Sequence, residues 1–295
     1  MSKRNTQDAK RAARERLRIE REKQAKKEKT RRTLAIGGGI VAVLALAGGI
    51  GFAVTNLTGG DSGGHWETAA KVAEEGSGGS ADGVTYKAPA NTSGKNGIEI
   101  VIGQKDAEHT LQVYEDMRCP VCAAFEQNVG ATAKKGIEDG DYKASYTFGT
   151  FIDDNPTLGG TGSRNALSAL GAALNVGPDA FMSYKEALFS KESHPEESED
   201  EFGDDAYLIE VAQGVDALEG NKKFDQAVKD GTFDAWAMRI SQKFDKAGIK
   251  GTPTLKLDGE KLTVDGQSPP MTPEQFSTLI EKKLGGDGKK QEQKQ

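Results

Sequence analysis

The longest apolar stretch of the chain is the 21-residue run from Leu34 to Val54, which contains no charged side chain. A helix of that length spans about 30 Å, the thickness of the hydrocarbon core of a bilayer. Arg31 and Arg32 directly precede the run, and the ten residues after it contain no Lys or Arg. This asymmetry predicts an uncleaved transmembrane anchor over 34–54, with the N-terminus in the cytoplasm and the remaining chain outside. The alternative, a cleaved signal peptide, has a shorter apolar core and a small-residue cleavage site.

A second pattern, of short strand-like alternations and longer helical spacings, predicts one folded domain over residues 97–284. Five segments have the alternation or composition of strands: 98–102, 111–114, 142–152, 254–257 and 261–264. Six segments have the spacing or composition of helices: 119–135, 166–174, 179–190, 207–213, 233–248 and 272–284. Because strands and helices alternate at the start and the helices then gather in one long stretch, the order predicts an α/β fold.

Charge and composition define the other segments. The formal net charge of −6 divides into +9 over the first 32 residues and −15 over the rest, so residues 1–33 are predicted to be a basic cytoplasmic tail. Such a tail attracts anionic lipid, and no aromatic or base-reading motif supports nucleic-acid binding. Residues 55–96 are rich in Gly, Ser, Thr and Asn and predict a flexible extracytoplasmic linker, in which 66–75 has helical composition. The acidic stretch 192–205 is predicted to be a solvated loop, and 285–295 a disordered tail.

The chain has two cysteines, Cys119 and Cys122, spaced Cys-Pro-Val-Cys at the start of a predicted helix. Pro120 suits a first helical turn, because the N–H that it lacks would be unpaired there. The first sulfur would then face the free N–H groups and the positive end of the helix dipole, which lowers a thiol pKa to about 3.5–7.5. The thiolate is the attacking group in disulfide exchange. We therefore expect Cys119 to be the exposed attacking sulfur and Cys122 the buried resolving sulfur.

Three other uses of the cysteine pair compete with redox chemistry. A zinc site needs about four ligands, but there is no second Cys pair, and His65, His109 and His194 are scattered. A structural disulfide that closes so short a loop would stabilise the fold only weakly. A reduced, inert pair fits poorly with a helix start and an oxidising compartment. The redox interpretation requires no metal or organic cofactor.

Two motifs together carry a family resemblance: Asp116-Met117-Arg118-Cys119-Pro120-Val121-Cys122 and, before a predicted strand, Gly251-Thr252-Pro253-Thr254. With the helical stretch between them, they are similar to the DsbA-like thioredoxin-fold family over about residues 98–284. The resemblance implies a thioredoxin-like core, in which helices flank a mixed sheet, and an inserted helical subdomain at about 156–248. It also implies that Pro253 is cis and faces the Cys pair, and that the backbone of Thr252 binds the substrate chain.

The resemblance implies a protein thiol–disulfide oxidoreductase that oxidises dithiols of exported proteins through a Cys119–Cys122 disulfide. A quinone-linked membrane enzyme would reoxidise the pair. Val121 departs from the best-studied oxidants of the family, which carry a thiolate-stabilising His there, so we expect a less acidic Cys119 and a less oxidising disulfide. A reductase or isomerase, and a non-catalytic peptide-binding module, therefore remain alternatives. Carboxylates relay protons in many thioredoxin-like sites; for Glu99 and Glu115, both on predicted strands, a solvated strand face is the simpler interpretation.

Overall fold

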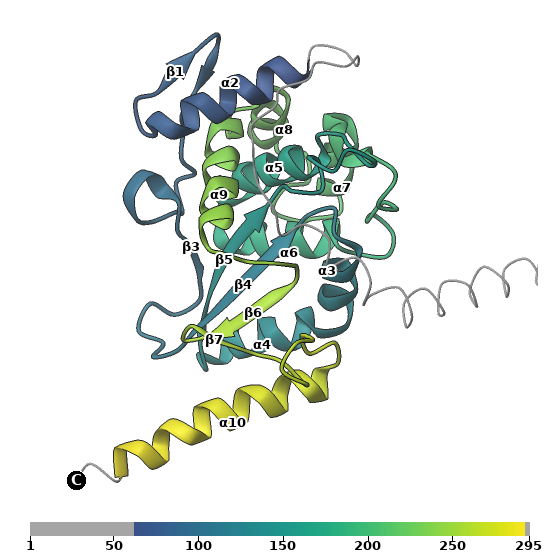
Figure 1. Ribbon diagram of the computed structural model, residues 1–295. Coiled ribbons are helices and arrows are strands. Elements are labelled where there is room, and N and C mark those ends of the chain that lie inside the picture. Colours follow the sequence, from purple (N-terminus) through teal and green to yellow (C-terminus); the bar gives the residue numbers. More distant parts are fainter. Residues whose placement is uncertain (1–61, 293–295) are drawn as a thin grey trace, which may run out of the picture. The chain divides into compact units, whose positions relative to one another are not determined.

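The computed structural model describes residues 62–292, at whose centre lies a five-stranded mixed sheet (Figure 1). Its strands are β3 (Ile100–Ile102), β4 (Thr110–Asp116), β5 (Lys143–Gly149), β6 (Thr254–Leu257) and β7 (Glu260–Lys261). They lie in the order β3-β5-β4-β6-β7, with β4 and β5 parallel and the other pairs antiparallel. The predicted α/β fold with a mixed sheet is confirmed.

The central strand β4 owes its position to the alternation of its side chains. Leu111, Val113 and Glu115 point to one face and are buried, in keeping with the two-residue period of a strand. The turn from β6 to β7 has positive φ at both Asp258 and Gly259, which is the geometry of a tight hairpin whose twist matches its strands. The five predicted strands are therefore present, although the last is shorter than predicted.

Helices flank the sheet and make up the insertion. They are α3 (Pro120–Phe125), the π-helix η2 (Glu126–Gly130), α4 (Ala131–Asp139), α5 (Gly162–Val176), α6 (Pro178–Leu188), α7 (Asp205–Ala212), α8 (Lys222–Lys229), α9 (Asp234–Lys246) and α10 (Pro273–Glu292), with 3-10 turns η1 (Lys95–Gly97) and η3 (Glu201–Gly203). Helices α5 to α9 fall within the predicted insertion, and Figure 1 shows α5, α7 and α8 gathered beyond the ends of β4 and β5. The sequence-based prediction missed α8, although Asn221 caps it by accepting the N–H groups of Lys223 and Phe224. It also ended α10 too early, at 284, so the predicted disordered tail begins as helix.

The insertion is built around α5, whose Ala, Leu and Gly residues are all buried. A Cβ on Gly171 would come within 2.8 Å of the Trp236 ring, so the glycine lets α5 approach α9 closely. Trp236 is fully buried, and its indole N–H donates to the carbonyl of Gly97 at 2.7 Å. This indole therefore joins the insertion to the segment that leads into the sheet.

Residues 62–96 are packed on the domain, so the flexible linker predicted for 55–96 is wrong over this part. Helix α2 (Ser62–Glu75) lies along α9 and buries Trp66, Ala69 and Val72 on one face (Figure 1). These positions recur every three residues, and the helical composition noted for 66–75 is confirmed by α2, which begins four residues earlier. The short hairpin of β1 (Ser80–Ala81) and β2 (Val84–Thr85) follows.

Polar contacts hold α2 at both ends. At its start, His65 Nε2 lies 2.6 Å from a carboxylate oxygen of Asp234, the first residue of α9. Further along, Gln242 donates to the carbonyl of Ala70 at 3.2 Å and Arg239 to that of Glu74 at 3.4 Å. The helix is therefore part of the folded unit.

The predicted basic tail 1–33 and transmembrane anchor 34–54 lie outside the described residues. Between residues 62 and 292, no helix has both the length and the apolar character that crossing a bilayer requires. The anchor therefore stays a prediction from the sequence.

Candidate active site

The two cysteines lie at the first turn of α3, as predicted. Cys119 is the N-cap, with extended backbone angles of φ −73° and ψ 116°, and Pro120 occupies the first helical position. The backbone N–H of Cys122 donates to Cys119 Sγ at 3.3 Å, so this sulfur takes the place of the usual capping oxygen. Both cysteines are free thiols in this structure.

The two thiols differ in burial and in acidity. Cys122 is fully buried, whereas Cys119 retains 6% of its surface. The order of exposure agrees with the prediction, but the expectation of an openly exposed Cys119 is wrong. Hydrogen bonding with the Cys122 thiol lowers the pKa of Cys119, against the effect of burial, and burial raises the pKa of Cys122 well above its usual value. Only the first sulfur is therefore a ready nucleophile.

The cover over Cys119 comes from the second sequence motif. The Thr252–Pro253 peptide is cis, as the family resemblance implied. The carbonyl oxygen of Thr252 lies 3.7 Å from Cys119 Sγ, within range of a hydrogen bond from the thiol. Residues 133 positions apart are thus brought together, while Val121, between the cysteines, is 42% exposed.

A group of three charged residues, here called the lysine cluster, lies beside Cys122: the buried Glu115 and Lys185 and the partly buried Glu126. Lys185 Nζ is 2.6 Å from Glu126 Oε1 and 3.5 Å from Glu115 Oε2. The ammonium also lies 5.0 Å from the centre of the Tyr146 ring, which adds a cation–π contact. Glu115 is fully buried, and neither of its oxygens accepts a hydrogen bond from the described residues. The solvated strand face considered for Glu115 is therefore wrong, whereas Glu99 is exposed as expected.

The lysine cluster is electrostatically coupled to the thiols. Burial raises the pKa of Glu115 well above its usual value, while the positive charge of Lys185 opposes the rise. The charge on Cys119 raises it further, and ionised Glu115 in turn raises the pKa of Cys122. A carboxyl that protonates easily therefore lies within the field of both sulfurs.

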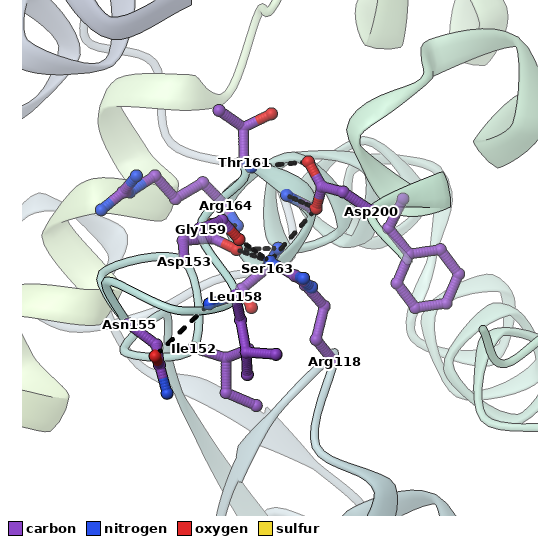
Figure 2. A network of polar contacts seen from close by, with 12 residues as sticks. Arg118, Ile152, Asp153, Asn155, Leu158, Gly159, Thr161, Ser163, Arg164 and Asp200 are labelled. Carbon is purple, nitrogen blue, oxygen red and sulfur yellow. Dashed lines mark hydrogen bonds and ion pairs between the residues drawn. The ribbon is translucent and has the colours of Figure 1, made fainter. Parts of the chain in front are cut away.

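A second group, here called the arginine cluster, joins Arg118, the residue before Cys119, to Asp153 and Asp200 (Figure 2). The Arg118 guanidinium is 3.0 Å from Asp153 Oδ1 and 3.2 Å from Asp200 Oδ1, and it also donates to the carbonyls of Gly159 and Glu197. Arg118 is 1% exposed, so this ion pairing is inside the protein.

The carboxylates of the arginine cluster also cap helix α5. Asp200 accepts the backbone N–H groups of Thr161 and Gly162, and Asp153 accepts those of Ser163 and Arg164. These are N–H groups that the start of a helix leaves unpaired. The acidic stretch 192–205, predicted to be a solvated loop, is therefore docked in part: Asp200 joins the cluster and Phe202 is fully buried. It supplies the negative charge that a buried guanidinium needs.

Sequence reasoning missed most of both clusters. Glu115 was considered because carboxylates near the buried sulfur relay protons in many thioredoxin-like sites. Lys185 and Asp200 are far from the motif in the sequence, and no local pattern links them to it. In the described residues, no group of three or more His, Cys, Asp or Glu could hold a metal ion.

A dithiol at a helix start, facing a cis prolyl peptide beside a mixed sheet, defines a thioredoxin-fold redox site. The chain belongs to a family described as Thioredoxin, whose family model matches residues 95–282. Disulfide bond formation protein D of Bacillus subtilis is 28% identical over 159 residues, which cover 54% of this chain and 67% of that protein.

Two solved structures share the fold. DsbA of Mycobacterium tuberculosis, in its oxidised form, is 23% identical with a TM-score of 0.52, over 63% of this chain and 93% of that one. Oxidised BdbD of Bacillus subtilis is 23% identical with a TM-score of 0.51, over 68% and 100%. The expected DsbA-like resemblance and the enzyme class, a thiol–disulfide oxidoreductase, are confirmed by the family match and by the Bacillus subtilis relative, and the two solved structures confirm the fold.

Proposed function

We propose that this chain is a membrane-anchored, extracytoplasmic enzyme that oxidises dithiols in exported proteins through a Cys119–Cys122 disulfide. The observation that carries the proposal is the position of Cys119 Sγ, between the start of α3 and the carbonyl of Thr252. A sulfur there is activated as a thiolate, and an extended chain bound along Thr252 and Pro253 presents its own sulfur to it. Pro120 and Val121 complete the motif.

The reaction starts from the oxidised pair. A substrate thiolate attacks Cys119 Sγ, the Cys119–Cys122 bond breaks, and Cys122 leaves with the electron pair. A second substrate thiol loses its proton and attacks the substrate sulfur of the mixed disulfide, which releases Cys119 as the thiolate. The substrate has then lost two electrons and the enzyme has gained them. Thr252 and Pro253 position the substrate chain for both attacks.

Cys122 needs a proton when it leaves, because it is fully buried and its thiolate is strongly disfavoured. Glu115 supplies it: its raised pKa keeps a proton available, and its charge acts directly on Cys122. Lys185 holds the resulting carboxylate, and Glu126, which is 11% exposed at its side chain, connects the cluster to solvent. The lysine cluster thus serves as the proton store for the resolving sulfur.

Membrane attachment follows from the apolar run 34–54, which supports an anchor that keeps the enzyme at the exported chains. The reduced pair must return its two electrons to a membrane partner, and a quinone-linked enzyme matches both the chemistry and the location. Neither a metal nor an organic cofactor takes part in the exchange itself.

Val121 gives a specific reason to consider the opposite direction of electron flow. Its side chain lies 42% exposed between the sulfurs and cannot donate a hydrogen bond to the Cys119 thiolate. The reduced dithiol is then less stable, relative to the disulfide, than in strong oxidants. The cysteine pair is therefore better suited to reducing or isomerising disulfides in substrates. A reduction potential close to that of thioredoxin, about −270 mV, would favour this second function.

The test is capture of mixed disulfides in membranes by the full-length chain with Cys122→Ala. We expect exported proteins bound through Cys119, separable by reductant on a gel and identifiable by mass spectrometry. Cys119→Ala in the same background is the matched control and should capture nothing. If cells that carry Cys119→Ala still form disulfides in exported proteins as the wild type does, the chain is a binding module and the catalytic proposal is wrong.

A further inference from the structure

Asp116, the last residue of β4, is a buried carboxylate three positions before Cys119. Its Oδ1 accepts the Ser163 hydroxyl at 2.6 Å and the backbone N–H of Arg118 at 3.0 Å, and its Oδ2 accepts the N–H of Ile152 at 3.3 Å. Its own carbonyl accepts the backbone N–H of Cys119 at 3.0 Å. The carboxyl is therefore fixed at the base of the turn that carries the nucleophile.

All three donors to this carboxyl are neutral. The nearest guanidinium, that of Arg118, is directed away to Asp153 and Asp200, and among the described residues no ion pair involves Asp116. Asp153 lies close enough to raise the pKa of Asp116 further. A buried carboxylate without a cation is costly when ionised, which favours the neutral form.

We propose that Asp116 is a positioning residue whose negative charge opposes the Cys119 thiolate, so that the redox equilibrium of the cysteine pair changes with pH near neutrality. The inference rests on the proposed function, since it concerns the same two sulfurs. Burial raises the pKa of Asp116 to about 7, and the ionised form raises the pKa of Cys119. Linkage is reciprocal, so a thiolate at Cys119 raises the pKa of Asp116 by the same amount.

The consequence can be written as a balanced exchange with glutathione. Two glutathione thiols reduce the disulfide, giving oxidised glutathione, the Cys122 thiol, the Cys119 thiolate and one proton. Near neutral pH, Asp116 is ionised beside the disulfide and takes up that proton when the thiolate forms. At acid pH, Asp116 is neutral in both redox states and has no effect. At alkaline pH, it is ionised in both states and disfavours the reduced enzyme.

Other titratable groups near the turn do not give the same response. Burial lowers the pKa of His194, whose ring Nε2 contacts the Met117 carbonyl, so this histidine is neutral above pH 7. Glu115 points to the opposite face of β4, and Asp153 and Asp200 are held by Arg118. All of these groups remain in an Asp116→Asn variant, so their contributions cancel in a comparison with the wild type.

The test measures the redox equilibrium of the full chain with glutathione between pH 5.5 and pH 8.5, for the wild type and for Asp116→Asn. We expect the equilibrium constant for reduction of Asp116→Asn to exceed that of the wild type by about tenfold at pH 8.5 and by less than about twofold at pH 5.5. One pKa unit of interaction between Asp116 and Cys119 corresponds to a tenfold change. A purely structural role of Asp116 would shift the equilibrium equally at all pH values. Such a constant shift, or no shift, would overturn the inference.

Ser163→Ala provides a second variant that keeps the charge. Loss of its hydroxyl removes a hydrogen bond that lowers the pKa of Asp116. Compared directly with the wild type, the pH range over which the redox equilibrium responds to Asp116 should therefore rise by about one unit. An unchanged or lower value would contradict the proposal even if Asp116→Asn does not fold.

Asp154→Asn is the matched control, because Asp154 lies on the same loop as Asp153 but its side chain is 66% exposed. The redox equilibrium of Asp154→Asn with glutathione should equal that of the wild type at every pH between 5.5 and 8.5. If the cysteine pair does not exchange with glutathione in any variant, the proposed function itself is wrong. If it exchanges without the pH-dependent difference, only the role of Asp116 is wrong.

Discussion

The lysine cluster and the arginine cluster flank the same pair of cysteines but differ in how completely their carboxylates are hydrogen-bonded. Asp153 and Asp200 each accept two backbone N–H groups in addition to Arg118. Glu115 accepts none from the described residues and has only Lys185, at 3.5 Å, as a counter-charge. A fully satisfied ionic group holds its charge and fixes geometry, whereas an unsatisfied one changes protonation easily. The comparison assigns the arginine cluster to structure and the lysine cluster to proton transfer.

Arg118→Met should have the largest effect, because it leaves the buried carboxylate of Asp153, and the partly exposed one of Asp200, without their cation. Removing one partner of a buried ion pair costs about 3–5 kcal/mol of unfolding free energy. Urea denaturation checks the loss. Arg164→Met, which removes the partner of the exposed Asp154, should cost less than about 1 kcal/mol. Equal losses in the two variants would break the distinction between a structural cluster and a surface pair.

Glu115→Gln should slow the exchange reaction by about a hundredfold or more, since it removes the proton donor for Cys122. The same variant should stabilise the fold at pH 8. The folded pKa of Glu115 lies above its unfolded value, so its charge costs stability at high pH, and the cost disappears as the pH falls through the folded pKa. Stopped-flow rates and urea midpoints at pH 8 and pH 4 measure both effects. A stability loss at both pH values would instead make Glu115 structural.

Val121→His sharpens the comparison from the Cys119 side. A histidine at this exposed position can donate a hydrogen bond to the thiolate, so the reduced form should be favoured by about tenfold at pH 7. Equilibration with glutathione provides the measurement. Val176→His, at a position of similar exposure on α5, is the control and should leave the equilibrium unchanged. A shift in both variants would point to a general charge effect.

His65→Gln should have the smallest effect, because the His65 side chain is 45% exposed and solvent screens its pair with Asp234. Hydrogen bonding to Asp234 raises the pKa of His65 above its usual value. The stabilisation is therefore fully present below pH 6.5 and is lost as the pH rises through the raised folded value. We expect a cost below about 1 kcal/mol at pH 6 and a smaller one at pH 9. A constant cost would mean that charge plays no part.

Local patterns in the sequence were enough to predict the main strands and helices of the fold and the position of the two cysteines at the start of a helix. Alternation predicted β4 and β6, and helical spacing predicted α9 and the start of α3, because each signal lies within one element. The spacing of Cys119 and Cys122 predicted which sulfur is the more buried, since one turn of helix separates them. That Pro253 is cis and faces the cysteine pair was implied by the family resemblance and not by a local pattern.

The partners of the buried charges could not be predicted in the same way. Lys185 lies on a helix of the insertion, and its contact with Glu115 depends on how α6 packs against the sheet. Asp200 lies in a stretch whose composition is typical of a solvated loop, and only the position of Arg118 makes it the partner of a buried charge. The helical composition of 66–75 predicted most of α2, but its docking could not be predicted, because the surface that it covers belongs to α9, far along the chain.

The docking of α2 changes where the smallest independently foldable piece of this protein begins. The family match starts at residue 95, but the surface of α9 that Trp66 and Val72 cover would be open to water in a piece cut there. Such a fragment should aggregate, whereas one that starts before Ser62 keeps that surface closed. In the proposed anchored enzyme, the same docking shortens the linker between the bilayer and the catalytic domain, because the folded domain begins near residue 62 instead of residue 97.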